Sequence, residues 1–163
     1  MVKYIYFRSR GFLSPWYLAN FKIDGDSYSS VEQYMMAQKA KFFGDIKALN
    51  EILAINDPSS IKKIGRKIAP FNSSKWSKVK DQIVFEGNLA KFSQNAEFKK
   101  RLLATYPAYL VEFGKDSYWG TGLTKGQTKS TAKNKWPGKN RQGEIIMKVR
   151  EKIKLESTGE AGE

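Results

Sequence analysis

Apolar residues dominate the chain between Ser29 and Gly44 and recur there at helical spacing. Ser30 stands three residues before Gln33, and Ser29 three before Glu32, which is the spacing of a helix capping box. Gly44 provides a left-handed stop at the far end. The pattern predicts a helix of about four turns over residues 29–44, buried on more than one side and central to the fold.

Shorter patterns predict the elements around this helix. Alternating, β-rich segments predict strands at 2–7, 19–23 and 110–113. Capping residues, prolines and helical spacing predict helices over 45–55, 57–68, 75–92 and 95–105, and a last helix that Asn140 caps. We therefore expect an α+β fold, mostly helical, with one small sheet made from the N-terminal strands and 110–113. Residues 1–155 should form one domain, and residues 156–163 a flexible acidic tail.

Glu32 and Lys39 raise the question of a site within the central helix. At 100° per residue they share one stripe with Met36 and Phe43. Helical side chains lean toward the N-terminus, so Lys39 leans back toward Glu32. One interpretation is that Glu32 completes the cap and Lys39 extends to water. The other is a functional pair, because buried charges without partners are costly.

Composition narrows the chemistry. The 163 residues include no Cys and no His, which excludes disulfides, thiolate nucleophiles, histidine bases and most transition-metal sites. Acid–base work must fall to Glu, Asp, Lys or Tyr, and we expect no metal or other cofactor. No apolar run approaches the length of a membrane span and no signal-peptide pattern opens the chain, so we expect a cytoplasmic protein without membrane contact, favoured as a monomer.

The positive charge indicates a phosphate-bearing partner. Net charge is +13, and residues 124–139 contain no acid. This segment reads as a solvated loop, and its five lysines are Lys125, Lys129, Lys133, Lys135 and Lys139. It is either a plain polar surface or a contact to the phosphates of a nucleic acid.

Four blocks in order give the chain a family resemblance. They are Phe12-Leu-Ser-Pro-Trp-Tyr17, Ser30-Val-Glu-Gln-Tyr-Met-Met-Ala-Gln-Lys39, Asp116-Ser-Tyr-Trp-Gly-Thr-Gly122 and Asn140-x-x-Gly143, which leads into Ile-Ile-Met-Lys-Val-Arg150. Together they resemble the YbiA-like, or NADAR, family over nearly the whole chain. The resemblance implies an N-glycosidase with the YbiA-like fold. Some family members cleave early riboflavin-pathway intermediates, and others remove ADP-ribose from guanine in DNA.

The resemblance also assigns residues to a site. It implies Glu32, Lys39 and Asp116 as catalytic residues, and its substrate-binding residues are Arg8, Phe12, Ser14, Trp16, Trp76, Tyr118, Trp119, Gly120 and Asn140. Trp119 would stack on the planar leaving base, and Trp76 would cover its other face. On spacing alone, Asp116 and Asn140 suit turn and cap roles instead. Pro15 and Gln33 depart from the family, whose members often carry Asn and His there.

Two classes of function remain open at this point. The first is hydrolysis of the C1–N bond between a (phospho)ribosyl or ADP-ribosyl group and a guanine-like base or amine, with ADP-ribosylguanine in DNA or a riboflavin-pathway ribosylamino-pyrimidinone phosphate as substrate. A carboxylate such as Glu32 would stabilise the positive charge that develops on the sugar. The second class is a non-catalytic module that binds ADP-ribose or nucleic acid through basic and aromatic side chains.

Overall fold

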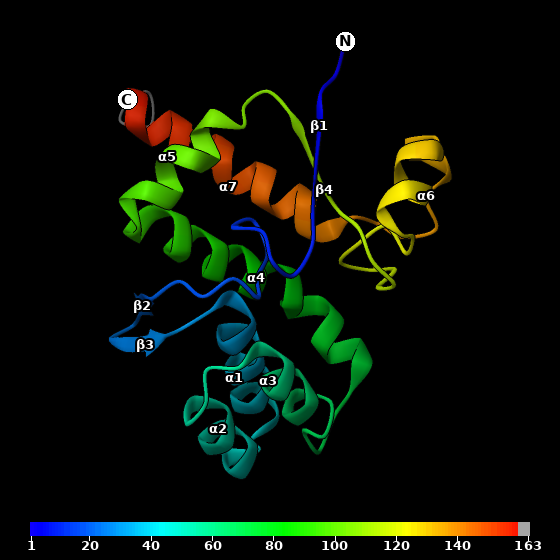
Figure 1. Ribbon diagram of the computed structural model, residues 1–163. Coiled ribbons are helices and arrows are strands. Elements are labelled where there is room, and N and C mark those ends of the chain that lie inside the picture. Colours follow the sequence, from blue (N-terminus) through cyan, green and yellow to red (C-terminus); the bar gives the residue numbers. More distant parts are fainter. Residues whose placement is uncertain (160–163) are drawn as a thin grey trace. The chain divides into compact units, whose positions relative to one another are not determined.

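The computed structural model describes residues 1–159, which divide into two compact units (Figure 1). The first unit combines residues 1–14 with the chain from Ala96 onward. Its elements are β1 (Tyr4–Phe7), α5 (Ala96–Ala104), β4 (Tyr109–Glu112), α6 (Lys125–Ser130), the 3-10 helix η1 (Lys133–Lys135) and α7 (Arg141–Thr158).

The second unit is Pro15–Asn95. Its elements are β2 (Phe21–Ile23), β3 (Asp26–Tyr28), α1 (Val31–Phe43), α2 (Ile46–Leu53), α3 (Pro58–Gly65) and α4 (Ser73–Gln94). The predicted α+β class is confirmed.

Helix α1 is the core of the second unit. It packs against α2, α3 and α4, and residues 31–37 are all buried. Two glycines let neighbouring helices approach it closely: a Cβ on Gly65 of α3 would overlap the side chain of Met36, and one on Gly87 of α4 would lie 2.9 Å from the Tyr34 ring. The prediction of a central helix buried on more than one side is confirmed within this unit.

The strands form two separate pairs, so the single small sheet was wrong. β1 pairs in parallel with β4, and β2 pairs antiparallel with β3. The reason is the turn at Asp24 and Gly25, which have φ of 52° and 85°. Positive φ at both central residues makes a tight hairpin that returns the chain at once. β2 is therefore paired locally with β3, which sequence reasoning missed.

Residues 124–139 are folded, which corrects the expectation of a solvated loop. Thr124 and Gln127 form a complete capping box at the start of α6. The indole nitrogen Nε1 of Trp136 donates to the carbonyl oxygens of Thr128 and Thr131, each at 3.1 Å. The Trp136 side chain thus bonds to the end of α6, and the lysines of the segment are carried by folded elements.

The C-terminal helix is longer than predicted. α7 continues through Thr158 and ends at Gly159, so residues 156–158 are helical and not part of a flexible tail. The rest of the predicted tail, 160–163, lies outside the described residues. The assignment of residues 1–155 to one domain stays a prediction. Within residues 1–159, no helix combines the length and apolar character needed to cross a membrane.

Candidate functional site

The first turn of α1 is held by side chains on both sides of Glu32. Ser30 is the N-cap and its hydroxyl accepts from the backbone N–H of Gln33 at 3.0 Å. The Gln33 amide accepts from the backbone N–H of Ser29 at 2.7 Å and donates to the carbonyl oxygens of Ile52 and Ile55. Gln33 therefore ties the start of α1 to the end of α2. Ser30 and Gln33 thus supply side-chain hydrogen bonds to the backbone at the start of α1.

Glu32 is buried at the helix start, with 4% of its surface exposed. Its backbone N–H donates to the carbonyl oxygen of Pro15 at 3.0 Å, so the Pro15–Tyr17 segment is attached directly to the residue that carries the carboxylate. Pro15, which departs from the family pattern, uses its carbonyl here and needs no N–H.

Lys39 lies two turns further along the same stripe and is half-buried. Its Nζ donates to the carbonyl oxygen of Gly65 at 2.9 Å. Burial lowers the pKa of Lys39, and the charge of Glu32 acts in the opposite direction. The two charges are thus electrostatically coupled, as the shared stripe predicted, and the neutral amine is easier to reach than for a lysine in water.

Aromatic rings surround the Lys39 ammonium. Its Nζ lies 4.7 Å from the ring centroid of Phe71 and 6.0 Å from that of Trp76, which is 8% exposed. Phe43 packs between them, 5.2 Å from Phe71 and 6.4 Å from Trp76, centroid to centroid. Asp45 helps to place the loop that carries Phe71, because its carboxylate accepts from the backbone N–H of Ala69 at 3.0 Å. The structure therefore brings Glu32, Lys39 and Trp76 into one cluster.

Trp16 has a cation of α3 as its neighbour. The Nζ of Lys62 lies 5.7 Å from the Trp16 ring centroid, within cation–π distance. Both side chains are half-buried. A ring with a lysine over it can contact a flat base while the ammonium contacts a phosphate.

The first unit holds the remaining predicted site residues, and Asp116 organises several of them. Its Oδ1 accepts from the backbone N–H groups of Tyr118 at 2.8 Å and Trp119 at 2.7 Å. The two rings meet edge to face, with centroids 4.8 Å apart. Lys139 places its Nζ 5.4 Å from the Tyr118 ring. Asp116 thus performs the turn role that spacing alone favoured, and it fixes the two aromatic residues beside a cation.

The same loop occupies the start of α7. The carbonyl oxygens of Gly120, Tyr118 and Trp119 accept from the backbone N–H groups of residues 140, 141 and 142. These amides are therefore not donors for a phosphate. A Cβ on Gly120 would lie 3.1 Å from two carbonyl oxygens, which explains the need for glycine in so tight a loop.

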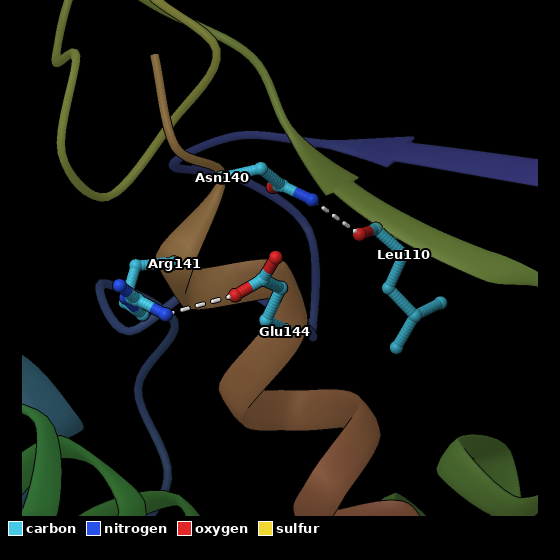
Figure 2. Close-up of polar contacts among 4 residues, drawn as sticks. All are labelled: Leu110, Asn140, Arg141 and Glu144. Carbon is cyan, nitrogen blue, oxygen red and sulfur yellow. Dashed lines mark hydrogen bonds and ion pairs between the residues drawn. The ribbon is translucent and has the colours of Figure 1, made fainter. Parts of the chain in front are cut away.

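Asn140 bonds to one edge of β4 (Figure 2). Its Nδ2 donates to the carbonyl oxygen of Leu110 at 2.9 Å, and its Oδ1 accepts from the backbone N–H of Glu112 at 2.8 Å. The side-chain amide thus takes the place of a peptide group from a neighbouring strand. Asn140 occupies the N-cap position of α7, as predicted, but its side chain makes no cap hydrogen bond there. Its predicted contact to a sugar stays a prediction.

The other three predicted binding residues also lie in the first unit. Arg8 is exposed and its Nε runs beside Gly114. Phe12 is half-buried, with the guanidinium of Arg101 stacked 4.0 Å above its ring centroid. Ser14 is 1% exposed and its backbone N–H donates to the carbonyl oxygen of Gly11 at 2.8 Å.

Comparison with known proteins decides the family. The family model described as NADAR domain matches residues 5–154, which is most of the chain. The chain belongs to the NADAR family.

Two curated relatives match over most of their own length. N-glycosidase R617 of Acanthamoeba polyphaga mimivirus is 42% identical over 162 residues, covering 91% of this chain and 95% of the relative. N-glycosidase YbiA of Escherichia coli K12 is 38% identical over 136 residues, covering 83% of this chain and 76% of the relative. The NMR structure of E. coli YbiA superposes with a TM-score of 0.79 at 32% identity, covering 97% of this chain and 89% of that one. The predicted resemblance and fold are confirmed, and the prediction of an enzyme is confirmed through relatives named N-glycosidases.

Sequence reasoning missed Phe71 in this NADAR chain. The residue is 49% exposed, yet its ring lies closer to the Lys39 ammonium than that of Trp76 does. The available signal was an aromatic residue after Pro70 in a polar loop just before a helix. Without the fold, nothing in that loop indicates which helix it crosses.

Proposed function

We propose that this chain is an N-glycosidase that hydrolyses the C1–N bond between a phosphoribosyl or ADP-ribosyl group and a guanine-like base or amine. The observation that carries the proposal is the placement, on one stripe of α1, of a buried Glu32 carboxylate and a half-buried Lys39 amine that feel each other's charge. The names of R617 and YbiA support the same class of reaction.

The reaction places specific demands on a carboxylate. When the C1–N bond breaks, its electron pair leaves with the nitrogen, and positive charge builds on C1 and the ring oxygen. A buried carboxylate is little screened by water and stabilises that charge. Water then bonds to C1 through its oxygen and gives up a proton, and the leaving nitrogen gains one. Glu32 is the residue we assign to charge stabilisation and to guiding this proton.

Lys39 has two possible roles, which one experiment separates. As a neutral amine it can attack C1 and displace the base, so that the opened sugar is held as an imine until water releases it. As an ammonium it can instead bind a hydroxyl or phosphate of the substrate. The lowered pKa supports the first role because it increases the neutral fraction. Borohydride reduction during turnover would trap the imine as a stable mass increase on Lys39, and the ammonium role gives no such adduct.

The residues of the first unit supply further proposed contacts. We assign Trp119 to stacking on the planar base and Asp116 to the second acid, because the Asp116 turn presents Tyr118 and Trp119 side by side. For the substrate itself we favour ADP-ribosylguanine in DNA, since a net charge of +13 attracts a polymer of phosphates. A riboflavin-pathway ribosylamino-pyrimidinone phosphate needs only one phosphate contact and is the comparison substrate.

Glu32→Gln tests the proposal. It keeps the shape of the side chain, and Ser30 and Gln33 still supply their hydrogen bonds at the helix start. We expect kcat to fall by at least ~10² while the melting temperature stays within a few degrees. Both substrates would be incubated separately, with products read by mass spectrometry. Glu51→Gln, at an exposed position on α2, is the matched control and should retain full activity. Near-normal turnover by Glu32→Gln would refute the assignment.

A further inference from the structure

A second aromatic and basic surface lies on the β1–β4 pair and is made of residues other than those assigned to chemistry. Tyr4 and Tyr6 are two apart on β1 and therefore share one face. Their rings stack, with centroids 6.2 Å apart and an interplanar angle of 23°. Tyr109 is the strand partner of Tyr4, and their rings meet at 5.8 Å. Tyr4 is 37% exposed and the other two rings are half-buried. We call these three residues the tyrosine face.

Lysines of the folded 124–139 segment lie over the tyrosine face. Lys129 on α6 places its Nζ 5.4 Å from the Tyr6 ring centroid, and Lys133 on η1 places its Nζ 3.7 Å from that of Tyr109. Figure 1 shows α6 beside the β1–β4 pair. The capping box and the Trp136 bonds order this segment, so the two lysines are carried over the face by folded elements.

We infer that the tyrosine face and its lysines bind single-stranded DNA, with bases stacked on the rings and phosphates held by Lys129 and Lys133. Aromatic rings next to lysines are the arrangement by which proteins bind single strands without sequence preference. The lysine side chains are exposed and flexible, so each ammonium can leave its ring for a phosphate. A duplex keeps its bases stacked internally and offers none to the rings. The choice of DNA rests on the proposed function.

Fluorescence anisotropy with a labelled dT15 oligonucleotide and a duplex of the same length tests this inference. We expect wild-type protein to bind dT15 more tightly than the duplex. The double variant Tyr4→Leu, Tyr6→Leu keeps apolar bulk but removes the rings, and should weaken dT15 binding about tenfold or more. Tyr4→Phe, Tyr6→Phe keeps the rings and should bind within about twofold of wild type. Equal binding by the Leu and Phe pairs would overturn the inference, as would a preference for duplex.

Lysine variants give a second test of the inference that does not depend on whether the tyrosine variants fold. Lys129→Gln, Lys133→Gln changes only exposed side chains, and should reduce the salt slope of dT15 binding by about 0.7 log units for each phosphate contact removed. Lys22→Gln, Lys78→Gln makes the same change of charge at exposed positions of the second unit and should leave the slope unchanged. Equal slopes for the two lysine pairs would overturn the assignment of phosphate contacts.

Failure of this inference can be told from failure of the proposed function. Glu32→Gln leaves the tyrosine face intact, so it should bind dT15 like wild type whatever its activity. If Glu32→Gln is inactive and the Tyr→Leu pair binds dT15 normally, the proposed function is supported and the inference about the tyrosine face is refuted. If Glu32→Gln is fully active and the Tyr→Leu pair no longer binds dT15, the inference about the tyrosine face is supported and the proposed role of Glu32 is refuted.

Discussion

Lys91 on α4 allows the effect of a buried titratable group on the free energy of unfolding to be measured. Its side chain is completely buried, with Nζ 5.9 Å from the Tyr17 ring centroid and 4.9 Å from that of Phe92. Burial lowers the pKa of Lys91 from 10.5 to about 7. The test is to compare the free energy of unfolding of wild type and Lys91→Met across pH, because Met has similar length and no charge.

The sign follows from the protons bound by each state. Below pH 7 the lysine is protonated in both the folded and unfolded protein, and the cost of burying its charge is constant. Between pH 7 and 10.5 the folded protein has lost this proton while the unfolded chain keeps it, so folding becomes more favourable as pH rises. The wild type should gain about 1.4 kcal/mol per pH unit relative to Lys91→Met in this window. From pH 7 to pH 9 that amounts to roughly 2–3 kcal/mol.

Urea unfolding at half-unit pH steps from 6 to 9 would measure the difference. The change in packing that comes with replacing the amine alters the stability of the Met variant equally at every pH, so only the pH-dependent part reports titration. Lys78→Met, at an exposed position of the same helix, is the control and should track wild type throughout. A constant difference between wild type and Lys91→Met would refute the reasoning, because it would mean that Lys91 keeps its proton in the folded protein up to pH 9.

Two further predictions concern the first unit. Asn140→Ala leaves the carbonyl of Leu110 and the N–H of Glu112 without their bonds, so chemical unfolding should show a loss of about 2–4 kcal/mol, and an unchanged stability would mean that water replaces the amide. Asp116→Asn preserves an oxygen for the N–H groups of Tyr118 and Trp119 but removes the charge, so steady-state assays should show kcat at least ~10-fold lower with an unchanged melting temperature. Full turnover by this variant would restrict Asp116 to the turn.

Elements set by adjacent residues could be predicted from the sequence. Ser30 caps α1 as its spacing predicted, and Asp45 and Asp57 cap the helices that were predicted to begin at 45 and 57. The burial of α1 also followed from its composition. Asp24-Gly25 carries an equally local signal for a hairpin, and the one-sheet prediction failed because it did not use that signal to pair β2 with β3. The capping box at Thr124 was overlooked in the same way, since the lysines around it suggested a loop.

Features that depend on distant residues could not be predicted in this way. Asn140 precedes a helix, and its φ of 49° was not visible from the sequence. That left-handed conformation turns the amide onto β4, where the polar groups of Leu110 and Glu112 need partners. An Asn before a helix can either cap that helix with its side chain or bond to the edge of a strand. The sequence is the same in both cases, and the backbone angle decides between them.

The candidate site also combines features set by adjacent residues with features set by distant ones. A spacing of seven residues places Glu32 and Lys39 on one stripe, but it does not say whether that stripe faces water. The answer comes from α3, where Gly65 lacks a side chain that would collide with Met36 and so lets its carbonyl reach Lys39. The ammonium therefore has one hydrogen bond, to the Gly65 carbonyl, and two aromatic rings, Phe71 and Trp76, nearby. Partial burial at this place lowers the pKa of Lys39, while the charge of Glu32 acts to raise it. A glycine twenty-six residues away is therefore as much a determinant of the proposed amine chemistry as the lysine that carries it.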